Sequence, residues 1–186
     1  MKIIGYNASP RKNGNTAWAV SKILDGAKEQ GASVEIWHAC ELEINPCRGC
    51  LSCVKSDKCC LADDMQKIYA TLKDADGLVL GAPIYMGQMS AQAKLFTDRL
   101  FAQITPRFSP RFKEENAGKK LVLVFTQGNP DESKFKAYCD YTRQMFQILE
   151  FDVVDMIIVA GTRAELASEK KDLLPALAAA AAKLGG

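Results

Sequence analysis

The sequence predicts an α/β fold in which helices cover both faces of one parallel sheet, giving three layers. Short apolar stretches rich in β-branched residues alternate along the chain with segments of helical periodicity. Strands separated in this way by helices become parallel neighbours joined by right-handed crossovers. The 186 residues are 48% hydrophobic and 25% charged, as in an ordinary globular protein. We therefore expect a single domain over residues 1–186.

The strands are predicted from short runs dominated by Val, Ile, Leu and aromatic residues. Such continuous apolar runs are typical of strands that are buried on both faces of a sheet. The predicted strands are Lys2–Tyr6, Ser33–Trp37, Gly77–Leu80, Lys120–Phe125 and Val153–Val159.

The helices are predicted from apolar residues that recur every three or four positions. A last, alanine-rich helix is expected from Leu173 to Leu184, and the polar stretch 105–118 is interpreted as a surface loop or flap. The residues expected to face the sheet are Trp18, Ile23, Leu24 and Ala27 in the first helix, Met65, Ile68, Tyr69 and Leu72 in the second, Ala91, Leu95, Phe96, Leu100 and Phe101 in the third, and Phe135, Tyr138, Cys139, Met145, Phe146 and Leu149 in the fourth.

Charge and hydropathy limit the classes of partner. A net charge of +2 gives no basic surface for nucleic acid or an anionic membrane, so we expect small molecules or other proteins as partners. No apolar run approaches the roughly 18 residues that cross a bilayer, so we expect a cytoplasmic protein without membrane contact. In that reducing compartment a dense group of cysteines more often binds metal or is redox-active than forms structural disulfides.

The segment between the first strand and the first helix has the features of a phosphate-binding loop. A phosphate needs free backbone N–H groups at a helix N-terminus, hydroxyl donors and a nearby cation, and Gly14 permits the turn. A capped helix start with a surface turn is the alternative interpretation. The candidate phosphate-binding residues are Ser9, Arg11, Lys12, Asn13, Asn15 and Thr16.

The segment after the third strand, residues 81–90, could hold a planar ring. Tyr85 and Met86 offer a flat, polarizable surface, and Pro83 and Gly87 allow a stiff, close approach of the backbone. An apolar loop that covers the sheet edge is the alternative. The candidate ring-binding residues are Pro83, Ile84, Tyr85, Met86 and Gly87, with Thr126, Gln127 and Gly128 after the fourth strand.

Position favours the binding interpretation of both segments. In a doubly wound sheet with strand order 2-1-3-4-5, the ligand crevice lies between strands one and three, at their carboxyl ends. The two segments follow these two strands. Phosphate-binding groups on one side of this crevice and a flat surface on the other would suit a mononucleotide that carries a large planar ring system.

Five of the seven cysteines lie between positions 47 and 60. The spacing of Cys47, Cys50 and Cys53 lets three thiolates converge from one short loop. Cys59 would supply the fourth thiolate that a [4Fe-4S] cluster requires, from a flexible segment that follows the loop. Cys60 leaves the fourth ligand ambiguous between two neighbours. Zinc, a disulfide or free thiols are the alternatives, although structural zinc usually takes two separated cysteine pairs.

With these segments placed, residues 1–160 resemble the NAD(P)H-dependent FMN reductase group of flavodoxin-like proteins, and most closely its iron–sulfur flavoproteins. The family has an SPR-x-x-(G)NT phosphate loop, a P-I-Y ring loop and a C-x2-C-x2-C-x4–7-C cluster motif. Ala8 departs from the glycine expected before SPR, and Met86 stands where an aromatic residue is common. The matching residues are Ser9, Pro10, Arg11, Asn15 and Thr16, then Pro83, Ile84 and Tyr85, then Cys47, Cys50, Cys53 and Cys59.

The resemblance implies a three-layer α/β/α fold with a five-stranded parallel sheet of order 2-1-3-4-5, FMN in the crevice and a [4Fe-4S] cluster in the cysteine loop. It implies a flavin-dependent oxidoreductase that passes electrons between a donor, such as ferredoxin or NAD(P)H, and a small acceptor, and that forms a homodimer or homotetramer. A flavin can exchange one or two electrons, which explains why a cluster would accompany it. The alternatives are a clusterless NAD(P)H-dependent FMN or quinone reductase, and a flavin-free binding module with a zinc or redox-sensing cysteine loop.

The remaining polar features are expected to be structural. Asp63 and Asp64 are expected to begin a helix, where carboxylates favour the positive end of the dipole. Asp98 and Arg99 are interpreted as a structural ion pair or a subunit contact. Two cysteines outside the loop are expected to be buried and to have no redox role: Cys40 and Cys139.

Overall fold

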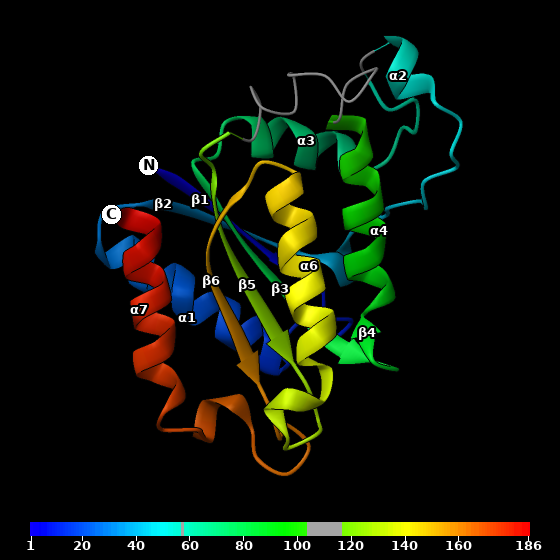
Figure 1. Ribbon diagram of the computed structural model, residues 1–186. Coiled ribbons are helices and arrows are strands. Elements are labelled where there is room, and N and C mark those ends of the chain that lie inside the picture. Colours follow the sequence, from blue (N-terminus) through cyan, green and yellow to red (C-terminus); the bar gives the residue numbers. More distant parts are fainter. Residues whose placement is uncertain (57, 104–116) are drawn as a thin grey trace.

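The computed structural model describes residues 1–56, 58–103 and 117–186. Its central sheet has five parallel strands in the order β2-β1-β3-β5-β6, which is the predicted order 2-1-3-4-5 when the predicted strands are counted along the chain. Figure 1 shows helices on both faces of this sheet, so the three-layer α/β/α prediction is confirmed. These strands are β1 (Lys2–Asn7), β2 (Ser33–His38), β3 (Gly77–Tyr85), β5 (Lys120–Thr126) and β6 (Asp152–Val159).

The end of β3 differs from the prediction. The strand continues to Tyr85, and a two-residue strand, β4 (Gln88–Met89), pairs with it antiparallel. Pro83 can lie in this strand because β1 stops pairing with β3 at Gly81, so the missing N–H of the proline lies beyond that ladder. Residues 81–90 were predicted to be a loop, and this was wrong for the part that forms the two strands.

Within residues 1–56, 58–103 and 117–186, two helices cover one face of the sheet and three cover the other (Figure 1). The first pair is α1 (Asn15–Glu29) and α7 (Leu173–Gly185), and the second group is α3 (Met65–Lys73), α4 (Ala91–Arg99) and α6 (Lys136–Ile148). A short helix, α2 (Ser52–Ser56), lies in the cysteine loop. The 3-10 helices are η1 (Ala39–Glu41), η2 (Leu100–Gln103), η3 (Glu132–Phe135) and η4 (Ala167–Glu169).

Alternation along the strands divides the core into two layers. Ile3 and Val79 pack with α1 and α7, whereas Ile4 and Leu78 pack with α3, α4 and α6. Most of the helix faces are as predicted. Ala91 is an exception, because it is exposed and the third helix buries Ala93 and Phe96 instead.

A glycine brings α1 close to the sheet and so fixes where that helix begins. A Cβ atom on Gly81 would lie 2.4 Å from Cγ2 of Val20 and 2.9 Å from Cγ2 of Thr16. Any larger residue would push α1 away from β3. The close approach places the first turn of α1 beside the carboxyl ends of β1 and β3.

Three expectations about single residues are settled by the fold. Cys139 is buried on α6 as predicted, but Cys40 is exposed because it lies in η1, beyond the end of β2. Asp98 and Arg99 do not pair with each other: Asp98 pairs with Lys94 on the surface, and Arg99 pairs with Asp63. Neighbouring residues of a helix do not face each other, so each finds a different partner.

Two other expectations concern the chain outside the elements. Residues 105–116 of the predicted flap lie outside the described residues, and Gly118 lies in an exposed turn before β5. In the part of the chain that the structure covers, no helix combines the length and apolar character needed to span a membrane.

Candidate functional site

The loop that follows β1 leads into α1 with its backbone donors free of side-chain caps. Gly14 is the N-cap residue, none of the side chains that the structure describes caps the helix, and no acidic residue stands in its first turn. Uncapped N–H groups at the positive end of a helix dipole favour an anion. The Ser9 hydroxyl accepts from the Arg11 amide at 3.0 Å, which holds the loop in a turn, while Arg11 and Asn13 are exposed.

Two of the predicted phosphate-binding side chains have partners within the protein. The Thr16 and Thr126 hydroxyl oxygens lie 2.7 Å apart in the interior, so Thr16 joins α1 to the end of β5. Asn15 accepts from the Ala167 amide at 2.8 Å and donates to the Thr162 carbonyl at 3.4 Å. Asn15 therefore fixes the segment after β6 against the start of α1, a contact that no local pattern indicates.

Lys12, one of the two predicted phosphate cations, pairs with an acid. Its Nζ atom lies 2.6 Å from Oε1 of Glu41, which follows β2. The hydrogen bond to Glu41 raises the pKa of Lys12, and the same bond lowers the pKa of Glu41. Both side chains are about half exposed, so the pair is a weak surface contact that an arriving phosphate can compete for.

The β3–β4 hairpin follows β3 at the same carboxyl edge of the sheet as the start of α1. Pro83 and Ile84 are buried, Tyr85 is 46% exposed and Met86 is fully exposed. Met86 and Gly87 have φ angles of +50° and +82°, as a tight two-residue hairpin turn requires. A bulky non-glycine residue in this conformation is strained, and such strain often marks a functional site.

Ser90, which the sequence analysis did not select, joins the two sides. Its hydroxyl donates to the Ala8 carbonyl at 2.6 Å and accepts from the Ala93 amide at the start of α4. Its amide donates to the Pro83 carbonyl at 3.0 Å. The signal for this residue was available, since a serine directly before a helical segment is a common N-cap.

The segment after β5 reaches the same edge of the sheet, because β5 pairs parallel with β3. The Gln127 side chain donates to the carbonyls of Asn129 at 3.2 Å and Asp131 at 2.7 Å, and these two contacts fix the orientation of the amide. Its Oε1 atom is buried without a hydrogen-bond partner among the residues that the structure describes. A buried acceptor of this kind needs a donor, which a bound ligand can supply. Thr126 and Gly128 flank this residue.

The cysteine loop forms a second site, away from the crevice. Cys47, Cys50, Cys53, Cys59 and Cys60 all line one small cavity at the end of α4, together with Arg99 and Phe101. The Sγ atoms of Cys50 and Cys60 are 3.7 Å apart, and Arg48 donates to Cys60 at 3.8 Å. Hydrogen bonds from Cys50 and Arg48 lower the pKa of Cys60, whereas burial raises the pKa of Cys53.

A known family matches most of the chain, including all the segments described above. Residues 1–165 match the family model of the NADPH-dependent FMN reductases. The chain belongs to this family. Membership confirms the family that the sequence motifs indicated.

Several relatives of this FMN reductase family member are iron–sulfur flavoproteins. One from Methanocaldococcus jannaschii is 39% identical over 162 residues, which is 87% of this chain and 76% of that protein. Another from the same organism is 42% identical over 99 residues, or 53% of this chain and 51% of that protein. One from Methanosarcina thermophila is likewise matched over 52% of its length, so the match spans about half the length of these last two relatives.

Solved structures of the family fold are similar throughout the chain. The NAD(P)H:quinone oxidoreductase of Methanothermobacter marburgensis has a TM-score of 0.76 at 14% identity, covering 100% of this chain and 98% of that one. An FMN-dependent NADH-azoreductase of Bacillus anthracis, solved with FMN, has a TM-score of 0.70 at 15% identity, with 100% of both chains covered. At this identity the likeness shows the shared fold.

The polar groups and the hairpin at the carboxyl edge of the sheet suit the parts of an FMN molecule. The uncapped start of α1 suits its phosphate, the hairpin suits its ring, and the unpartnered Gln127 Oε1 suits a ring N–H. In the sequence the residues are far apart, but the sheet brings the three segments to one edge. Whether each of them touches FMN stays a prediction.

The thiols also fit a sulfur-bound cluster in their chemistry. No group of three or more Cys, His, Asp or Glu side chains within the described ranges could hold a metal ion as placed. Cys50 and Cys60, which lie 3.7 Å apart, would have to separate for each to bind a different iron of a cubane cluster. The Arg99 Nε–H is buried without a partner at the described residues, and Arg99 lines the same cavity, which suits an anionic group there.

Proposed function

We propose that this protein is an FMN-dependent oxidoreductase that binds its cofactor in the crevice between β1 and β3. The observation that carries the proposal is the convergence of an uncapped helix start, a strained hairpin and a buried unpartnered amide oxygen at the carboxyl edge of the sheet. Bound FMN supplies one- and two-electron redox chemistry. Family membership supports the same conclusion.

The chain itself would bind and orient the cofactor. The α1 amides and Arg11 would hold the phosphate, with Lys12 once it leaves Glu41. The hairpin at Met86 would support the ring, and Gln127 would accept a hydrogen bond from it. Ser90 keeps the walls of the crevice at a fixed separation, because it bonds to both of them.

We further propose that the cysteine pocket holds a [4Fe-4S] cluster and that electrons pass between a donor, such as ferredoxin or NAD(P)H, and a small acceptor. Five thiols around one cavity and the names of the relatives support this part of the proposal. Cys47, Cys50 and Cys53 would supply three ligands, and Cys59 or Cys60 the fourth.

The separation of the two sites favours a homodimer or homotetramer. Ser90 begins α4 at the crevice and Arg99 ends it at the cysteine pocket, so about 14 Å of helix separates the sites within one chain (Figure 1). An apolar groove between α4 and α6, lined by Leu51, Tyr141 and Met145 among others, adjoins the cysteine pocket. A second copy seated in this groove would cover exposed apolar side chains and bring another crevice closer to the thiols.

Cofactor analysis of anaerobically purified protein tests these proposals. We expect FMN equimolar with the chain and about four iron atoms with matching sulfide. Cys50→Ala should lose iron and keep FMN, Arg11→Gln should weaken FMN and keep iron, and Cys40→Ala, which removes a thiol outside the pocket, should keep both. FMN without iron would favour the clusterless reductase, while zinc without FMN would favour a flavin-free binding module.

A further inference from the structure

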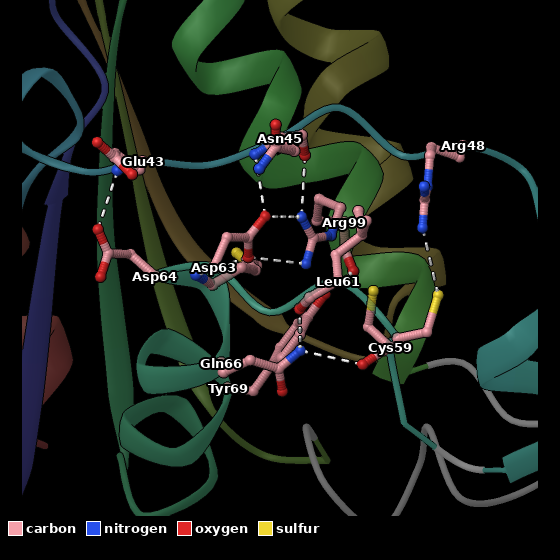
Figure 2. A network of polar contacts seen from close by, with 12 residues as sticks. Glu43, Asn45, Arg48, Cys59, Leu61, Asp63, Asp64, Gln66, Tyr69 and Arg99 are labelled. Carbon is pink, nitrogen blue, oxygen red and sulfur yellow. Dashed lines mark hydrogen bonds and ion pairs between the residues drawn. The ribbon is translucent and has the colours of Figure 1, made fainter.

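The guanidinium group of Arg99 joins the two ends of the cysteine loop (Figure 2). Nη1 donates to the Asn45 carbonyl at 2.9 Å and to Asp63 Oδ2 at 2.6 Å, and Nη2 donates to Asp63 Oδ1 at 3.1 Å. Asn45 stands before the first cysteine of the loop and Asp63 stands after the last. A two-pronged contact to a carboxylate fixes direction as well as distance, which a lysine could not do.

Backbone contacts extend this junction. Asp63 Oδ2 accepts from the Asn45 amide at 3.0 Å, and Glu43 and Asp64 exchange two hydrogen bonds of 2.9 and 3.1 Å. Residues 46–62 therefore leave and re-enter the domain at one fixed point. Because Arg99 belongs to α4, whose Phe96 lies in the core, this point is fastened to the core rather than to the loop itself.

Two side chains of α3 support the part of the loop that leads back into the domain. Gln66 donates to the carbonyls of Cys59 at 3.1 Å and Leu61 at 2.7 Å. Tyr69 donates to the Arg99 carbonyl at 2.5 Å, which ties α3 to the end of α4. The backbone at Cys59 is thus held by α3, and α3 is in turn tied to the end of α4.

The ion pair is almost fully removed from solvent, with side-chain exposures of 1% for Arg99 and 3% for Asp63. Buried charge is retained only where it is paired and hydrogen-bonded. Both atoms of the Asp63 carboxylate are occupied, yet the Arg99 Nε–H has no partner among the described residues. Arg99 also lines the cavity that the five thiols surround.

We infer that Arg99 is a positioning residue for the cysteine pocket and the source of positive charge for an anionic, sulfur-bound centre in it. Its Nη atoms set the two ends of the loop, so that the thiols meet around one cavity. Its remaining N–H and its charge favour the more negative, reduced form of such a centre, since charge and hydrogen bonds to sulfur set cluster potentials. The second role rests on the proposed cluster, whereas the first does not.

The positioning role is tested without any metal. The double variant Arg99→Gln/Asp63→Asn removes both charges but keeps similar volumes and polar ends, so no carboxylate is left buried alone. In cluster-free protein we expect trypsin to cut after the exposed Lys55 and Lys58 about tenfold faster in this variant than in the wild type, because the loop ends are released. Lys67→Gln, which removes the surface pair with Asp64, is the matched control and should cut at the wild-type rate. Equal rates in the double variant and the wild type would overturn this role.

The charge role is tested by redox titration of the iron-loaded proteins. Arg99→Gln, which removes the positive charge and keeps Asp63, should have its reduction equilibrium weakened about tenfold, a shift of about 59 mV to lower potential for a one-electron centre. The double variant, which removes both charges, should shift less. Arg99→Lys should lose protection from trypsin and keep most of the potential. An unchanged potential in an Arg99→Gln variant that holds wild-type iron would overturn the charge role. If the wild-type protein contains no iron, the proposed cluster itself is wrong. Iron analysis of the wild type shows this before any variant is measured.

Discussion

The hydroxyl oxygen of Thr16 lies 2.7 Å from that of Thr126, and both side chains are buried. The contact joins the first turn of α1 to the end of β5 and so connects the proposed phosphate site with the third side of the crevice. If Thr126 is the donor, the proton of Thr16 remains free for a phosphate oxygen. The direction of one hydrogen bond thus decides whether Thr16 can bind the cofactor.

Replacing each threonine separately should distinguish these roles. Thr16→Val should weaken FMN binding about tenfold, because a hydrogen bond to a charged group contributes about 1.5 kcal/mol or more. Thr126→Val should weaken it less, although both variants lose about 1–3 kcal/mol of stability through an unpaired hydroxyl. Fluorescence titration of FMN-free protein measures the affinities. A larger loss in Thr126→Val would show that Thr126 is the residue that contacts FMN.

The Lys12–Glu41 pair should limit the affinity for the phosphate. Glu41→Gln frees Lys12, so FMN should bind about twofold to fivefold more tightly at low salt, and the gain should vanish at high salt. Lys12→Gln should have the opposite effect. Riboflavin, which lacks the phosphate, is the control ligand and should bind equally to both variants. A gain that riboflavin shares would mean that Glu41 acts on the ring rather than on the phosphate.

Asp63 should make the stability of the fold depend on pH in the acid range. Burial alone would raise the pKa of Asp63, but hydrogen bonds from Arg99 and the Asn45 amide hold it below its usual value. A carboxyl whose pKa is lowered on folding stabilises the protein above its unfolded pKa, about 3.9, and loses that stabilisation as pH falls through its folded pKa. Urea unfolding from pH 7 to pH 3 measures the effect.

The matching variant is Asp63→Asn. At pH 7 it should lose about 3 kcal/mol, because it leaves the Arg99 charge buried without its partner. The difference from the wild type should shrink below about pH 4. Asp64→Asn, at the neighbouring and more exposed carboxylate, should cost much less stability than Asp63→Asn. A difference between Asp63→Asn and the wild type that is constant with pH would contradict the account of this pair.

Gly81 should control both stability and FMN affinity. Gly81→Ala places a methyl group 2.4 Å from Val20 Cγ2, so it should cost about 1–3 kcal/mol and push the start of α1 away from the crevice. Val20→Ala in the same chain removes the nearer clash and should recover part of both losses. Thermal unfolding and FMN titration measure the two effects. No recovery in the double variant would show that another contact is responsible.

Much of the fold follows from local sequence patterns. The parallel strands are continuous Val- and Ile-rich runs, and helical periodicity lies between them, so strand order needed only the crossover rule. The predictions failed where tertiary contacts decide. Pro83 and Gly87 indicated a loop, but Pro83 lies in β3, where it pairs with Thr126, and only Met86 and Gly87 form the turn to β4.

The site could be predicted only in part, for a similar reason. Segments at strand ends are placed by topology, so the residues around Ser9, Tyr85 and Gln127 could be expected to meet. Partners of individual side chains could not, since Thr16 and Thr126 are 110 positions apart and Arg99 and Asp63 are 36 apart. The predicted ion pair between Asp98 and Arg99 was wrong for this reason, because the actual partner of Arg99 is distant in the sequence.

Titration of cofactor-free wild-type protein with FMN, followed by calorimetry, tests the central claim most directly. We predict saturation at equimolar FMN, with riboflavin bound at least about tenfold more weakly because the start of α1 has no phosphate to hold. Absence of heat and of saturation with excess FMN, or equal affinity for riboflavin, would contradict a crevice built around a flavin phosphate.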